Sequence, residues 1–78
     1  MPRKLRILSG KEVIKILEKH GFLLKRTLGS HARLSLITKE KETFHITVPL
    51  HVELKKGTIK GIVSELEKYV SIDDFYTK

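Results

Sequence analysis

The spacing of apolar residues along the chain changes twice, and each change marks a boundary between predicted elements. A first apolar stripe has helical spacing and consists of Val13, Ile16, Leu17 and His20. Ser9 and Glu12 precede it as a capping box, in which each side chain satisfies a free amide at a helix start. Gly21 supplies the left-handed residue that commonly ends a helix. We therefore predict a first helix over about Gly10–His20.

After the first predicted helix, apolar residues recur at every second position. Apolar and mostly polar side chains alternate over Phe22–Leu28, His31–Thr38 and Thr43–Val48, as in antiparallel strands that are covered on one face only. Short links around Gly29-Ser30 and Lys39–Glu42 predict that the strands follow one another as a meander. Pro49 has no amide hydrogen to donate, so it is expected to end the third strand.

Helical spacing returns over about Thr58–Tyr69. The second stripe consists of Ile59, Ile62, Val63 and Leu66. Ser71 and Asp74 suggest another cap, which would open a short C-terminal turn (71–78) in which Ile72 and Phe75 dock. We therefore expect one domain over 1–78, of the α+β class and in the order α-β-β-β-α. Both helices should cover the same face of a three-stranded antiparallel sheet, because nothing else is available to bury it.

Residues directly opposite each other in an antiparallel pair point to the same side, and this constrains the register. If Leu24 and Leu34 share the core, the first hairpin needs an odd-length loop or a bulge, and Gly29 suits the positive φ of such a loop. The open face is then expected to carry Lys25, Thr27, His31, Arg33, Ser35, His45 and Thr47. The parity of Arg26 points it toward the core, so it would reach the open face only around the sheet edge.

A three-residue second loop would place Ser35 opposite His45, and His31 opposite Pro49. His51 would then lie nearer to His31 than His45 does, since His31 and His45 would be about four residues apart along the sheet, roughly 10 Å or more. His31 with His51 is therefore the better acid–base pair.

The charge of the chain narrows the class of partner. Sixteen Lys and Arg against nine Asp and Glu give +7 and a pI near 9.9, which favours a nucleic-acid partner over a plain solubility charge. The absence of cysteine excludes thiol catalysis and cysteine-based zinc sites. The four histidines match no zinc-binding spacing. We therefore expect no metal and no cofactor.

No membrane partner is expected either. No apolar run approaches the ~20 residues of a membrane span. The basic segment 1–8 is not followed by the apolar stretch of a signal peptide. These features are typical of a cytoplasmic protein.

Several residues fit both an ordinary and a functional role. His20, near a helix C-terminus, is interpreted as structural, and His45 as a surface residue. Lys55, Lys56 and Lys60 surround the start of the second helix, which suits either a phosphate contact or an ordinary basic helix start. On composition alone, a histidine beside a turn, such as His31, is more often plain surface than catalytic.

A resemblance changes the weight given to His31. The segments that carry it are His20-Gly21-Phe22, Arg26, Gly29-Ser30-His31, Val48-Pro49-Leu50-His51 and Leu54-Lys55-Lys56-Gly57-Thr58-Ile59. In this order and spacing the chain resembles, over about Ser9 to Phe75, the HicA family, the toxin half of HicA–HicB toxin–antitoxin pairs. It departs from that family in the basic segment Pro2–Leu8, which typical members keep shorter.

The resemblance implies a fold like that of the double-stranded-RNA-binding domain and ribonuclease activity on mRNA. It also implies that the histidine of the Gly-Ser-His turn, here His31, is needed for activity. We take His31 as general base or acid and His51 as the second proton carrier in a metal-independent transesterification. The candidate RNA-binding residues are Lys25, Arg26, Gly29, Ser30, Arg33, Lys55, Lys56 and Lys60.

The resemblance also implies a protein partner, a HicB-type antitoxin, which we expect to cover His31 and the basic face. Two alternatives remain open from the sequence. One is a non-catalytic RNA-binding module of the same fold. The other is a protein-interaction domain whose open face docks an acidic partner.

Overall fold

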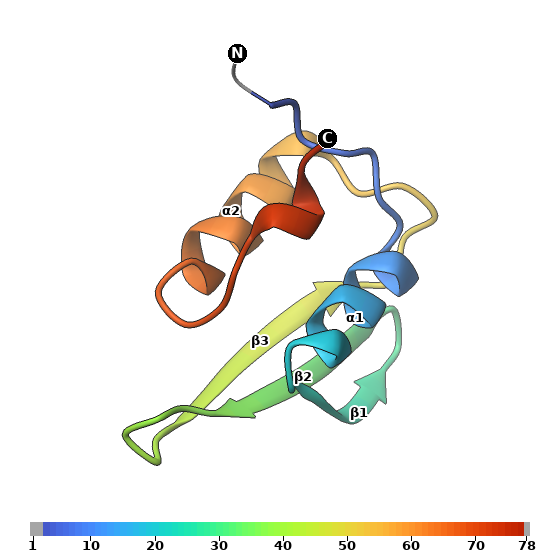
Figure 1. Cartoon of the computed structure of the whole chain (residues 1–78). Helices are drawn as coiled ribbons and strands as arrows, with labels where there is room; N and C mark the ends of the chain where they lie inside the picture. The colour runs from blue at the N-terminus through green and yellow to red at the C-terminus, as the bar shows by residue number, and fades with distance from the viewer. Residues whose placement is uncertain (1–2, 78) are drawn as a thin grey trace.

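The computed structural model describes residues 3–77 and has two helices packed on one side of a small sheet (Figure 1). The elements in chain order are α1 (Gly10–Lys19), β1 (Leu23–Leu28), β2 (His31–Ile37), β3 (Thr43–Pro49), α2 (Lys56–Leu66) and a short 3-10 helix, η1 (Asp73–Phe75). The strands are antiparallel in the order β1-β2-β3. The predicted α+β class and α-β-β-β-α order are confirmed. Residues 1–2 and 78 of the predicted terminal segments lie outside the described residues.

Both ends of α1 follow from local chemistry. The Glu12 amide donates to Ser9 Oγ (3.1 Å) and the Ser9 amide donates to Glu12 Oε1 (2.8 Å), which confirms the capping box and lowers the pKa of Glu12. At the other end Gly21 has φ 97°, and the Phe22 amide donates to the Leu17 carbonyl (3.0 Å). This Schellman motif ends the helix at Lys19, one residue before the predicted end, because His20 is the C-cap.

The second helix is displaced from its prediction although its buried stripe is correct. Ile59, Ile62, Val63 and Leu66 are all buried, but α2 begins two residues before Thr58 and ends three before Tyr69. Beyond Leu66 the chain forms a turn, in which the amides of Tyr69 and Val70 both donate to the Leu66 carbonyl. The Tyr69 ring packs on Phe44 of β3, with centroids 4.6 Å apart. This aromatic contact joins the turn after α2 to the sheet.

The two terminal segments pair with each other. Leu5 forms an antiparallel bridge with Tyr76. The Arg6 amide donates to the Phe75 carbonyl (2.8 Å), and the Thr77 amide to the Lys4 carbonyl (2.7 Å). Phe75, between these bonds, is completely buried, as predicted. Residues near 5 and near 75 therefore act as one structural unit.

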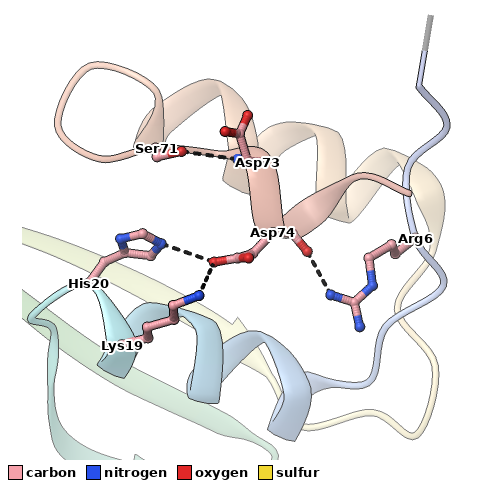
Figure 2. A network of polar contacts seen from close by, with 6 residues as sticks. All are labelled: Arg6, Lys19, His20, Ser71, Asp73 and Asp74. Atoms are coloured by element: carbon pink, nitrogen blue, oxygen red, sulfur yellow. Dashed lines mark hydrogen bonds and ion pairs between the residues drawn. The ribbon is translucent and has the colours of Figure 1, made fainter. Parts of the chain in front are cut away.

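Asp74 joins this unit to α1 (Figure 2). Lys19 Nζ donates to Asp74 Oδ2 at 3.2 Å, and His20 Nε2 lies 3.3 Å from the same oxygen. The bond from Lys19 and then that from His20 hold the pKa of Asp74 below its usual range. His20 thus has the predicted structural role. The predicted cap between Ser71 and Asp74 is wrong, because Ser71 Oγ accepts from the Asp73 amide instead and the Asp74 carboxylate faces α1.

The register of the second hairpin is the one predicted from the sequence. The register of the first hairpin decides between the two predicted alternatives, an odd-length loop and a bulge. Ser35 pairs with His45 and His31 with Pro49, around a loop in which Lys41 has φ 64°. In the first hairpin the turn Gly29-Ser30 has two residues, and the required irregularity is a bulge between Leu24 and Arg26.

This bulge reverses the sides predicted for two residues of β1. The extra residue is Lys25, and beyond it Arg26 pairs with Arg33 on the open face, while Thr27 pairs with Ala32 on the covered face. The predictions that Arg26 faces the core and that Thr27 lies on the open face are therefore wrong. An unpaired extra residue shifts the alternation of every later residue by one.

Two glycines provide a test of the packing. A Cβ on Gly10 would collide with the Pro49 carbonyl oxygen, whereas a Cβ on Gly61 of α2 meets nothing within 4 Å. We expect Gly10→Ala to lower the free energy of unfolding by about 1–3 kcal/mol. Gly61→Ala should raise it by about 0.5–1 kcal/mol through helix propensity. Urea denaturation measures both changes. A stabilised Gly10→Ala variant would contradict the close approach of α1 to the end of β3.

Candidate active site

The open face of the sheet carries cross-strand rows of side chains at the end where β2 begins. In the first row Leu28, His31 and Pro49 are neighbours, and in the second row Arg26, Arg33 and Thr47. A shallow hollow of about 150 Å³ lies over these rows. Its lining residues are Arg26, Leu28, His31, Ala32, Arg33 and Thr47. The hollow places one imidazole beside two guanidinium groups.

His31 is held at the edge of the hollow by the turn that precedes it. Gly29 has φ 59°, a conformation that suits glycine. The Leu50 amide donates to the Ser30 carbonyl at 2.6 Å, which ties the turn to the chain that leaves β3. Since His31 is the first residue of β2, its backbone is fixed by the sheet while its side chain stays exposed.

The two arginines are an unfavourable pair in the absence of an anion. Arg26 and Arg33 are directly opposite each other, and like charges in this position destabilise a sheet by about 0.2–1 kcal/mol. Among residues 3–77 neither forms an ion pair with a carboxylate. Arginine can hold two oxygens of one phosphate. An anion of that kind, bound in the hollow, would remove the repulsion.

The other predicted site residues lie at different distances from this hollow. His51 is exposed two residues past Pro49, and its carbonyl accepts from the Gly10 amide (2.9 Å), but it does not line the hollow. Lys25 is the bulged residue on the edge strand. His45 lies in another row, with Nδ1 2.7 Å from Ser35 Oγ. The structure therefore brings His31 together with Arg26 and Arg33.

Three of the predicted RNA-binding residues lie on a different part of the surface. Lys55, Lys56 and Lys60 line an open groove beside the N-terminal segment rather than the hollow at His31. No three His, Asp or Glu side chains within the described part of the chain are grouped so as to hold a metal ion.

Three residues that line the hollow, Leu28, Ala32 and Thr47, are not among the predicted site residues. Leu28 lies opposite His31 because the turn at Gly29-Ser30 has two residues. Thr47 was predicted on the open face but not as part of a site, and its side chain lines the same hollow. The signal for both was the cross-strand register.

These features define a small basic α+β domain in which one hollow on the open face of the sheet is lined by a histidine and two arginines. The comparison with protein families agrees and is more specific: the family described as the HicA toxin of bacterial toxin–antitoxin matches residues 10–68. The chain belongs to the HicA toxin family. No curated protein and no solved structure matches it significantly. Of the helices formed by residues 3–77, none has the length and apolar content to cross a bilayer.

The arginine pair leads to a stability test. Arg26→Gln should raise the free energy of unfolding at low salt by about 0.2–1 kcal/mol, because it removes the repulsion from Arg33. Lys25→Gln removes the same charge from the neighbouring position, where no cation lies opposite, and should change stability less. Urea titrations at low and high salt measure both, and added salt should abolish the difference. A loss of stability in Arg26→Gln at low salt would show that the two charges do not oppose folding.

Proposed function

We propose that this toxin is an endoribonuclease that cleaves mRNA in the cytoplasm and that His31 is its catalytic residue. The observation that supports this is the hollow in which exposed His31 lies beside Arg26 and Arg33, neither of them in an ion pair within residues 3–77. Histidine is the side chain best suited to exchange protons near neutral pH, and the arginines suit a phosphodiester. A plain polyanion-binding surface would need no histidine at that position.

The reaction that fits these groups uses a nucleophile already present in RNA. The ribose 2′-hydroxyl loses its proton as its oxygen attacks the adjacent phosphorus. A 2′,3′-cyclic phosphate forms, the bond to the 5′-oxygen breaks, and that oxygen gains a proton. His31 takes the first proton or gives the second. Arg26 and Arg33 stabilise the charge that develops on the phosphate oxygens. This route requires no metal ion, and DNA, which lacks the hydroxyl, should resist it.

The remaining predicted residues have supporting roles in this proposal. His51 is the candidate for the second proton transfer, because it follows the cross-strand neighbour of His31 by two residues. Lys25, Gly29 and Ser30 flank the hollow as candidate RNA contacts. Lys55, Lys56 and Lys60 are candidate contacts to more distant phosphates. Contacts to phosphate and sugar carry little sequence information, so we expect weak sequence preference.

Cleavage of 5′-labelled RNA in EDTA tests the mechanism. We expect His31→Ala to reduce the rate by about 10²- to 10⁴-fold, the usual contribution of one positioned acid or base, and His51→Gln to reduce it by a similar factor. His45→Gln is the matched control, since it removes an exposed histidine from another row of the same sheet. The product should end in 2′,3′-cyclic phosphate.

Equal cleavage by folded His31→Ala and wild type would remove His31 from the mechanism. RNA binding without cleavage by the wild type would instead support a non-catalytic RNA-binding module.

We also propose that a HicB-type antitoxin inhibits the toxin by covering the hollow. Leu28, beside His31 on the open face, is 69% exposed, so the hollow combines cations with apolar surface suited to an acidic protein partner. The antitoxin should stop cleavage and protect His31 from modification by diethyl pyrocarbonate, measured by mass spectrometry. A stable complex in which His31 reacts as fast as in the free toxin would contradict this interface.

A further inference from the structure

A second group of cationic side chains lies away from His31. An open groove of about 610 Å³ runs between the N-terminal segment Arg3–Ile7 and the start of α2. Its cationic lining side chains are Arg3, Lys4, Arg6, Lys55, Lys56 and Lys60, against one carboxylate, Glu53. Leu54 and Ile59 also line it. A groove with cations on two opposed walls suits an extended polyanion better than a single small anion.

The wall formed by the N-terminal segment is fixed in place. Arg3 Nη2 lies 3.0 Å from Asp73 Oδ1, and its guanidinium is 5.4 Å from the centre of the Tyr76 ring. Arg6 Nη1 donates to the Asp74 carbonyl at 2.7 Å (Figure 2). On the other side of the segment the Leu54 amide donates to the Leu8 carbonyl at 2.8 Å. These contacts hold the cations at a set position beside α2.

Most of what builds this wall lies outside the part of the chain that matches the HicA family. The family match covers residues 10–68, while the segment Arg3–Leu8 and its partners Asp73–Thr77 flank it on either side. The lysines of α2 belong to the matched part. The groove is therefore completed by segments that lie outside the matched range.

The groove and the hollow are close enough for one RNA strand to reach both. Leu50 is bonded to Ser30 in the turn before His31, and Lys55 lines the groove. The five peptide units between them span at most about 18 Å when fully extended. A strand with its reacting phosphate at His31 can thus place neighbouring phosphates in the groove.

We propose that the N-terminal segment and α2 together form a second binding site for the RNA backbone, which grips the strand outside the point of cleavage. This rests on RNA as the proposed substrate. The preferred substrate is then an RNA strand long enough to span the hollow and the groove. The same linear polyanion satisfies both clusters of cations.

Lys4 and Lys60 allow a test because they stand on opposite walls. Both are exposed, and neither side chain takes part in a hydrogen bond or ion pair within residues 3–77. We would introduce Lys4→Gln and Lys60→Gln together in the His31→Ala protein, in which RNA stays intact. Fluorescence anisotropy with a labelled RNA strand would be measured over a range of salt. The matched control is Lys39→Gln with Lys68→Gln, two exposed lysines that line a different hollow.

The groove variant should bind RNA about two- to five-fold more weakly for each cation removed. Its slope of log affinity against log salt should fall by about 0.7 for each phosphate that is no longer neutralised, and the control should keep the slope of the parent. Identical affinity and slope in the groove variant and the control would overturn the proposal. Unchanged RNA binding in a variant that no longer binds the antitoxin would also overturn it and assign the groove to a protein interface.

The binding assay separates this proposal from the catalytic one. If wild-type protein fails to cleave RNA while the groove variant binds RNA more weakly than the control, the groove site stands without the nuclease. If cleavage depends on His31 while the groove variant binds as the control does, the nuclease stands without the groove site.

Discussion

The bulge at Lys25 is the constraint on which the candidate site depends. In a regular β1, Arg26 would lie on the covered face of the sheet. The one extra residue places Arg26 on the open face instead, opposite Arg33 and next to His31. The same shift places Leu28 beside His31 across the two-residue turn. A bulge costs ladder hydrogen bonds on an edge strand and redirects side chains. Here it assembles two like charges on a surface that folding alone would not favour. The geometry of β1 therefore brings together the two guanidinium groups to which the proposed function assigns the phosphate.

The sequence predicted those parts of the fold whose causes are local. The capping box at Ser9 and the left-handed Gly21 locate α1, and period-two alternation with the short loop after β2 gives the register of His31 against Pro49. The face of the sheet on which Arg26 lies was not predictable. An odd-length loop and a bulge both place Leu24 in the core, and they differ only in the face given to the residues after the bulge. Beyond the end of α2, Tyr69 contacts Phe44 of the sheet, and no helical periodicity reports such a contact.

The candidate site likewise has a part that the sequence predicts and a part that only the structure shows. His31 was singled out by resemblance to a family, since its composition and position alone favour an ordinary surface residue, and its catalytic role stays a prediction. The neighbourhood of His31 came from the structure, because it depends on pairing between strands. The groove is least visible in the sequence: Lys4 meets Thr77 across 73 positions, and no spacing rule connects residues so far apart. The lysines at α2 were predicted as phosphate contacts, but their opposite wall was not.

The pairing of the two terminal segments also sets the order in which the protein is completed during synthesis. The sheet and α1 depend on contacts between residues close in sequence and can form while translation continues. The fully buried Phe75 and the bond it accepts from the Arg6 amide become available only after the ribosome has released that part of the chain. A nascent chain can therefore carry a formed sheet while its core is still open beside α2. The basic groove is complete only once the residues near 75 have left the ribosome, so a shorter nascent chain lacks this surface toward the messenger that encodes it.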